Sequence, residues 1–241
     1  MPGVLIAEML LLVAVNDHGH VPARTDSFVK VGLAGALLAE LAIDGQLTIG
    51  DDGRVRTGDT RPGDELLGDV YDAVRTHLEG RKAKQVVDGL SGHIGGSWNR
   101  VVDRLADAGV LGRVRPSVLR PTRHPVLDSA ARRAVLDQVQ AAAKGEGPVR
   151  SDVAVVLALA GPCRLLERVA PDRGTRGEAK KQIARVTAET PFTPSVANII
   201  GELVAAVTAT ATTTPSRLQR AAAKRSFSAS RSHASDVTMG F

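Results

Sequence analysis

The sequence predicts a mainly α-helical, single-domain protein that carries β-hairpins and ends in a disordered basic tail. Residues 29–44 are apolar almost all round a helix, which is typical of a central, buried helix. Residues 65–78 repeat apolar side chains at intervals of three and four, as an amphipathic helix does. Residues 46–57 alternate about Asp52-Gly53, which indicates a β-hairpin.

The composition narrows the possible functions. Of 241 residues, 43% are hydrophobic and 24% charged, which is ordinary for a soluble protein large enough to bury a core. Aromatic residues make up only 2%, so the core must be aliphatic and few rings can stack on nucleic-acid bases. The single cysteine excludes an internal disulfide and a multi-thiolate zinc site. A net charge of +5 favours an anionic partner.

The N-terminal segment 4–15 is predicted to be a buried helix that leads into a short strand. Its apolar run is shorter than the ~20 residues that a membrane-spanning helix needs, and it lacks the features of a signal peptide. The run ends in a strong turn signal, Asn16-Asp17-His18-Gly19. His18 and His20 have no third metal ligand nearby, so we assign them to the turn.

The helix at residues 29–44 contains small residues and one acidic residue. Gly32 and Gly35 allow neighbouring helices to approach closely, and Gly45 follows where a left-handed helix cap is expected. Glu40 lies within the apolar surface. We expect a buried ion pair between Glu40 and an arginine, in preference to a functional carboxylate.

The second half of the chain is predicted to be helical. Asp128 is expected to cap one helix, and Ser151 or Asp152 the next. Cys163 is interpreted as a small core residue at a helix junction, because no His/Asp motif accompanies it. The remaining helices are expected at residues 82–94, 98–108, 128–143, 151–161, 164–169, 177–188 and 195–209.

The composition changes near Thr208. A Thr/Ala run gives way to a stretch rich in Ser, Ala and Arg, with too little apolar periodicity to pack. The predicted organisation is therefore a helical domain over residues 1–207 and a disordered basic tail over residues 208–241.

Residues 110–126 form an unusual basic segment. It holds arginines without any acidic residue, and its prolines argue against a buried central strand. An exposed hairpin with an apolar tip suits an anionic membrane surface, where each arginine contributes ~1 kcal/mol. An edge hairpin that its arginines keep from aggregating fits equally well. The membrane-contact candidates are Arg113, Arg115, Val118, Leu119, Arg120 and Arg123.

Motifs for catalysis are absent from the sequence. It contains no P-loop, no strand-linked G-x-G-x-x-G, no H-E-x-x-H and no G-x-S-x-G. The acidic pairs Asp51-Asp52 and Asp64-Glu65 fall at loop positions, where such residues form turns and caps. We therefore expect no enzyme activity, no catalytic residues, no cofactor and no metal.

Four segments occur in a characteristic order: LLLVAVNDHGH (10–20), GLAGALLAELAIDGQL (32–47), GDELLGDV (63–70), and RLADAGVL followed by RPTRHPV (104–126). Together they resemble the GPP34 family, the group of Golgi phosphoprotein 3. The central helix followed by glycine and a hairpin is the most specific part. The similarity runs from about Leu10 to Val207, and the composition indicates a bacterial, actinobacterial, member.

The resemblance implies a mostly helical domain that attaches to membranes through phosphatidylinositol 4-phosphate. Eukaryotic members also bind the cytosolic tails of glycosyltransferases. The projecting apolar hairpin of the family corresponds to residues 112–125 here. The tryptophan and arginines of the eukaryotic phosphate pocket fall at or near Thr25, Ala34, Gly95 and Trp98, which do not match. Charge for a head-group site is available nearby from Arg24, Lys30, Arg100 and Arg104.

The favoured function is a cytoplasmic module that binds anionic phospholipid head groups on the inner face of a membrane, with a possible role as an adaptor for membrane proteins. A winged-helix nucleic-acid binder is one alternative, because a helix followed by a basic hairpin is also typical of that fold, with Arg100 and Arg104 facing phosphates. A lipid-independent protein scaffold is the other. The sequence names no protein partner and leaves homo-oligomerisation open.

Overall fold

The structure is a computed structural model of the chain, and it describes residues 3–92, 96–113, 124–189 and 196–212. Within these ranges it is mainly helical, as expected, with one small antiparallel sheet. The helical elements are α1 (Ile6–Ala14), α2 (Ala23–Ile43), α3 (Glu65–Ala73), the π-helical turn η1 (Val74–Leu78), α4 (Ala83–Ser91), α5 (Ser97–Asp107), α6 (Ser129–Lys144), α7 (Ser151–Ala160), α8 (Leu166–Val169), α9 (Arg176–Glu189) and a further helix over residues 196–212.

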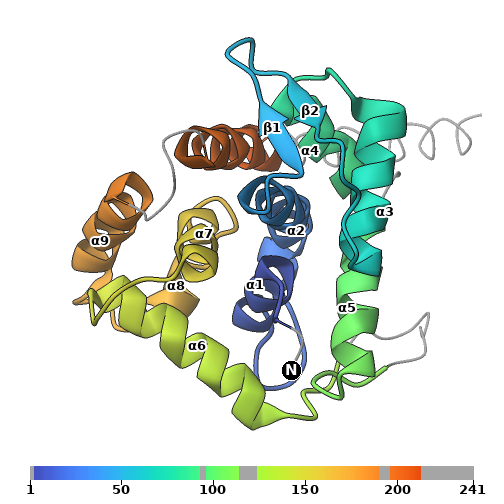
Figure 1. Ribbon diagram of the computed structural model, residues 1–241. Helices are drawn as coiled ribbons and strands as arrows, with labels where there is room; N and C mark the ends of the chain where they lie inside the picture. The colour runs from blue at the N-terminus through green and yellow to red at the C-terminus, as the bar shows by residue number, and fades with distance from the viewer. Residues whose placement is uncertain (1–2, 93–95, 114–123, 190–195, 213–241) are drawn as a thin grey trace, which may run out of the picture.

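Helices α1 and α2 pack side by side at the centre of the molecule (Figure 1). All of α1 and most of α2 are buried, because apolar residues cover nearly the whole circumference of each helix. α3, α4 and α5 contact this pair on one side, and α6, α7 and α8 contact it on the other. The core is aliphatic as the composition requires, and Tyr71 is the one aromatic residue among its largest fully buried side chains.

Two glycines bring α2 close to its neighbours. A Cβ added at Gly32 would lie 2.2 Å from Cys163 Sγ, and one at Gly35 would lie 2.4 Å from Cγ2 of Val207. The prediction that these glycines permit close helix packing is confirmed. Gly45 follows α2 with φ +73, as expected of a residue that ends a helix in the left-handed conformation.

The hairpin predicted about Asp52-Gly53 is present. Strands β1 (Leu47–Ile49) and β2 (Val55–Thr57) pair in antiparallel register, with Thr48 opposite Arg56. The predicted cap of α6 is also confirmed, since an Asp128 side-chain oxygen accepts the backbone N–H groups of Ala130 and Ala131 at 3.0 and 2.9 Å.

Three local predictions are wrong. Segment 4–15 does not end in a strand, because α1 stays helical to Ala14; the predicted turn follows directly, and the Asn16 side chain accepts the N–H groups of His18 and His20 there. Neither Ser151 nor Asp152 caps α7; its N-cap residue is Arg150, which makes an ion pair with Asp152. The last helix, expected to end near residue 209, continues to residue 212, since Ala211 still packs in a buried position. The remainder of the predicted tail lies outside the described residues.

Candidate membrane-binding site

The basic hairpin predicted after α5 has a well-formed base. Leu111 and Val126 form an antiparallel bridge, and the Gly112 N–H donates to the Pro125 carbonyl at 2.6 Å. Leu111 is fully buried, so the base is part of the core. The two ends of the segment therefore pair as a hairpin should. Its predicted contact residues Arg115, Val118, Leu119, Arg120 and Arg123 lie outside the described residues.

The hairpin base is attached to the turn that follows α1. The His124 N–H donates to the Gly19 carbonyl at 2.9 Å. Gly19 has φ +76, and a Cβ there would lie 2.2 Å from the His124 carbonyl oxygen. Only glycine combines this backbone conformation with so close an approach. The contact fixes the position of His124, the described end of the segment, against the turn after α1.

A cation and two rings meet beside this base. The Lys30 ammonium lies 5.3 Å from the ring centroid of Trp98, within cation–π range. The His124 ring packs beside the same tryptophan at a tilt, with ring centroids 6.3 Å apart. Lys30 also makes an ion pair with Asp26 at 2.7 Å. The Lys30–Trp98–His124 cluster thus connects α2 and α5 to the base of the hairpin.

Residues 6–227 match the family model for Golgi phosphoprotein 3 (GPP34), nearly the whole chain. The chain belongs to the GPP34 family. No curated protein matches it significantly. The family prediction made from the four sequence segments is therefore confirmed, and the cluster and hairpin base can be considered as parts of a GPP34 domain.

In this GPP34 chain, each of the four basic residues predicted to hold a head group pairs with an acidic side chain. Arg24 is 76% exposed and contacts Glu167 of α8 at 3.3 Å. Arg100 pairs with Asp69 of α3. Lys30 forms an ion pair with Asp26, and Arg104 forms ion pairs with Glu8 of α1 and with Asp64, the N-cap residue of α3. The four basic residues therefore have different acidic partners. A phosphate pocket shared by all four would require some of these ion pairs to break.

Arg104 holds three elements of the GPP34 domain together. Its guanidinium contacts Glu8 of α1 at 2.9 Å and Asp64, the N-cap residue of α3, at 2.5 Å. Burial raises the pKa of Glu8, and the Leu5 N–H and Arg104 partly oppose that shift. This geometry gives Arg104 a structural role.

The prediction that Glu40 forms an ion pair with an arginine is wrong. Glu40 Oε2 accepts the Ile6 N–H at 2.6 Å, and it is Glu8 of α1 that pairs with an arginine, Arg104. Among the residues that the structure describes, Glu40 has no basic partner. The error arises because the sequence places Glu40 within an apolar surface but does not show which carboxylate an arginine reaches. In the structure Glu8 is buried, whereas Glu40 is only partly buried.

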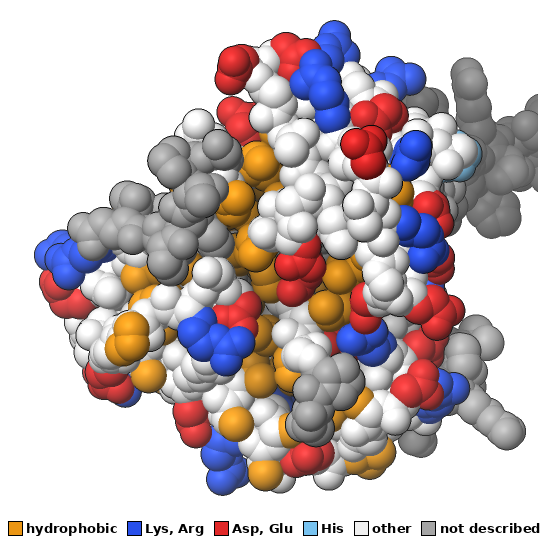
Figure 2. All heavy atoms as spheres, viewed as in Figure 1, with side chains coloured by type: hydrophobic (Ala, Val, Ile, Leu, Met, Phe, Trp, Pro, Cys, Tyr) orange, Lys and Arg blue, Asp and Glu red, His pale blue; other side chains and the backbone are white. Residues whose placement is uncertain are grey.

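The surface of this GPP34 protein mixes charges of both signs. Figure 2 shows basic and acidic side chains interspersed on the visible face, with hydrophobic side chains between them. Arg113, the one predicted hairpin arginine within the described residues, is exposed and pairs with Asp107 at the end of α5. No helix in the described ranges is long and apolar enough to cross a bilayer. The described residues also contain no cluster of His, Cys, Asp and Glu suited to a metal ion.

Sequence reasoning missed Trp98 and His124 as parts of the candidate site. The available signal was that Trp98 is the only tryptophan in the chain and lies at the start of the helix before the basic hairpin. His124 carried a weaker signal, its place next to Pro125 at the end of that hairpin. Burial lowers the pKa of His124, and the Gly112 carbonyl and Asp103 partly oppose the shift.

Proposed function

We propose that this protein is a peripheral membrane module that binds anionic phospholipid head groups. The observation that carries the proposal is the hairpin base: a basic segment without acidic residues leaves the folded core at a point fixed by Gly19, His124 and the Leu111–Val126 bridge. Membership of the GPP34 family supports a lipid-binding role. A function in binding, rather than catalysis, is part of the proposal.

Two contributions would combine at the membrane. Burial of Val118 and Leu119 supplies ~3–6 kcal/mol at most. Each hairpin arginine adds ~1 kcal/mol near an acidic surface. Lys30, which lies beside the hairpin base in the Lys30–Trp98–His124 cluster, can add a further positive charge at the membrane. Arg24, exposed on the first turn of the same helix, can add another. The apolar and basic contributions are of similar size, so both should be needed.

Vesicle sedimentation tests the proposal. The protein is mixed with vesicles of neutral phosphatidylcholine, of phosphatidylglycerol, or containing phosphatidylinositol 4-phosphate, each at low and moderate salt. We expect binding to acidic vesicles that weakens with salt. Binding that is confined to the phosphoinositide and resists salt would instead indicate a specific pocket. Absence of binding to every vesicle overturns the proposal.

Matched variants locate the contact. Val118→Asp with Leu119→Asp, and separately Arg113, Arg115, Arg120 and Arg123→Ala, should each weaken vesicle binding by about tenfold or more. The control removes four exposed arginines elsewhere, Arg81, Arg133, Arg173 and Arg185→Ala, and so matches the loss of charge. Equal weakening in the control would mean that net charge, and not the hairpin, directs binding.

The nucleic-acid alternative is tested in the same preparation. It requires Arg100 and Arg104 to face phosphates, yet both pair with carboxylates of the domain. Affinity for a short DNA duplex at low salt that exceeds affinity for acidic vesicles would favour that alternative. Because Trp98 is the sole tryptophan, its fluorescence reports directly on the cluster during both titrations.

A further inference from the structure

A second feature lies where α7 ends. The Leu165 N–H donates to the Ala160 carbonyl at 2.8 Å, which closes the helix in a Schellman motif. Within this motif the Arg164 N–H donates to the Gly161 carbonyl at 3.0 Å. Arg164 has φ +57 and is the one non-glycine residue with a positive φ in the described ranges. Glycine is the usual residue at this left-handed position, so an arginine there carries backbone strain.

The guanidinium of Arg164 lies on the ring of Phe28 in α2. Its Cζ is 3.9 Å from the ring centroid, which is a stacking distance, and Phe28 is buried and therefore forms a fixed platform. Stacking covers one face of the guanidinium and leaves the N–H groups at its edge to bind an acceptor. Glu167, the nearest acidic residue along the chain, pairs with Arg24 and Arg176. Arg164 thus has no acidic partner among the residues that the structure describes.

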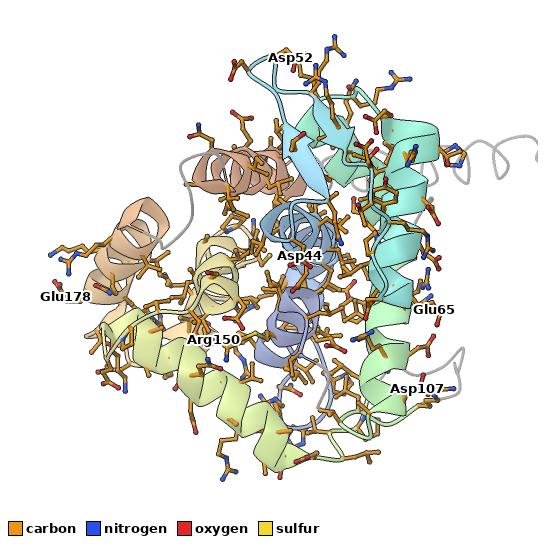
Figure 3. All side chains as sticks on the ribbon, in the orientation of Figure 1. Asp44, Asp52, Glu65, Asp107, Arg150 and Glu178 are labelled. Carbon is orange, nitrogen blue, oxygen red and sulfur yellow. The ribbon has the colours of Figure 1, made fainter. Side chains whose placement is uncertain are left out.

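A cavity of about 390 Å³ opens beside this guanidinium, and we call it the α7-end pocket. Its lining includes Phe28, Arg164, Thr208 and Thr212, and it contains no acidic residue of the described ranges. α2, α7 and the helix of residues 196–212 pack together in this region, since a Cβ added at Gly35 would lie within 4 Å of side chains from both other helices. Figure 3 shows side chains of these three helices filling the space between their ribbons.

Two threonines give the α7-end pocket hydrogen-bond acceptors. Thr208 and Thr212 are one helical turn apart and lie on the same face of their helix. Their hydroxyl groups donate to the carbonyls of Val204 and Ala209 at 2.7 and 2.9 Å. With the hydroxyl protons engaged, the threonine oxygens can accept hydrogen bonds from a ligand. The pocket therefore offers a cationic donor fork on one side and neutral acceptors on another.

We propose that the α7-end pocket binds an acidic side chain of a partner peptide. The edge of the Arg164 guanidinium matches both oxygens of one carboxylate, and the threonine oxygens accept N–H groups of the adjoining peptide bonds. One guanidinium balances one carboxylate, whereas a phosphate dianion would retain a negative charge without a cation. Phe28 and Lys30 are two residues apart on α2 and so point to nearly opposite sides of it. The pocket is therefore separate from the proposed lipid-binding site.

NMR titration of the full chain with a capped tripeptide tests the proposal. The probe is N-acetyl-Ala-Glu-Ala-amide, and the control peptide N-acetyl-Ala-Gln-Ala-amide has the same shape without the charge. The glutamate peptide should cause saturable shifts of the Arg164 side-chain signal and of the Thr208 and Thr212 amide signals, and salt should weaken its binding. The glutamine peptide should cause none. Absence of saturable shifts with the glutamate peptide, or equal shifts with both peptides, would overturn the proposal.

Two small anions show which chemistry the α7-end pocket recognises. Acetate should bind more weakly than the glutamate peptide, because it lacks the N–H groups that the threonine oxygens accept. Inorganic phosphate should also bind more weakly, because the pocket has a single cation among its described lining residues. Acetate that binds as tightly as the peptide would overturn the assignment to a peptide. Phosphate that binds more tightly than the peptide would overturn the assignment to a carboxylate.

Variants of Arg164 separate binding from folding. Arg164→Gly removes the guanidinium but supplies the usual residue of the motif, so the chain should fold while binding of the glutamate peptide weakens about tenfold or more. Arg164→Lys keeps the charge without the fork and should also bind more weakly than the wild type. Arg81→Ala removes an exposed arginine elsewhere and should leave binding unchanged. Unchanged binding in Arg164→Gly, or an equal loss in Arg81→Ala, would contradict the proposal.

Discussion

Arg132 and Arg168 donate hydrogen bonds to the same carbonyl, that of Val15 at the C-terminal end of α1. Arg132 contributes Nε and Nη2 at 3.0 and 2.7 Å, and Arg168 contributes Nη2 at 2.7 Å. α1 has no basic residue in its own last turn, so guanidinium groups from α6 and α8 satisfy the end of this buried helix. Burial and the nearby positive charge of Arg132 lower the pKa of Arg168.

Replacing Arg132 should destabilise the fold. Its side chain is only 7% exposed, and Arg132→Ala removes two hydrogen bonds from a buried carbonyl and an ion pair with Asp17. We expect a loss of about 3 kcal/mol in the free energy of unfolding, measured by urea denaturation. Arg133→Ala, at an exposed position on the same helix, is the control and should change stability by less than about 0.5 kcal/mol. Equal midpoints for the two variants would show that the Val15 carbonyl does not need Arg132.

Gly32 and Cys163 should be energetically coupled. A methyl group at Gly32 would collide with Cys163 Sγ and come within 3.1 Å of Leu10 Cδ2, so Gly32→Ala should cost about 1–3 kcal/mol. Adding Cys163→Ala makes room for the methyl group, and the double-mutant cycle should recover about 1 kcal/mol or more.

A second glycine provides the control for that cycle. Gly201 is in the helix of residues 196–212, and a Cβ added there meets no atom within 4 Å. Gly201→Ala should therefore stabilise the protein by about 0.5–1 kcal/mol, because alanine favours the helix. Additive effects of Gly32→Ala and Cys163→Ala in thermal or chemical denaturation would contradict the predicted contact.

The hairpin base should weaken in acid. The folded-state pKa of His124 lies below its ordinary value because burial opposes the charged form. The unfolded chain therefore binds a proton more readily, and the contribution of this residue to stability, present at neutral pH, is lost as pH falls below about 6.5. His124→Gln should reduce that loss, measured by chemical denaturation and by exchange of the Gly112 amide, whereas exposed His77→Gln should not. An identical acid response in wild type and His124→Gln would contradict it.

Much of the fold could be predicted from local patterns. The central helix, the hairpin about Asp52-Gly53 and the Asp128 cap depend on signals confined to a few neighbouring residues, and each is confirmed. α2 nevertheless begins at Ala23, six residues before the predicted start, because Thr25 and Phe28 are also buried by packing from distant elements. The polar residues near the start of α2 gave no local signal that the helix begins there.

The candidate site was less predictable because it depends on contacts between distant segments. Lys30, Trp98 and His124 come from three separate parts of the chain, and Arg104 reaches Glu8 from 96 residues away. The sequence by itself determined the helical class, the aliphatic core, the family and the position of the basic hairpin, since periodicity, composition and turn residues act over short range. Only the tertiary structure decided which charged groups pair and why Glu40 has no basic partner among the described residues. It also decided which two arginines donate to the carbonyl at the C-terminal end of α1. An ion pair forms between groups that packing brings within a few ångströms, and sequence separation does not specify that distance.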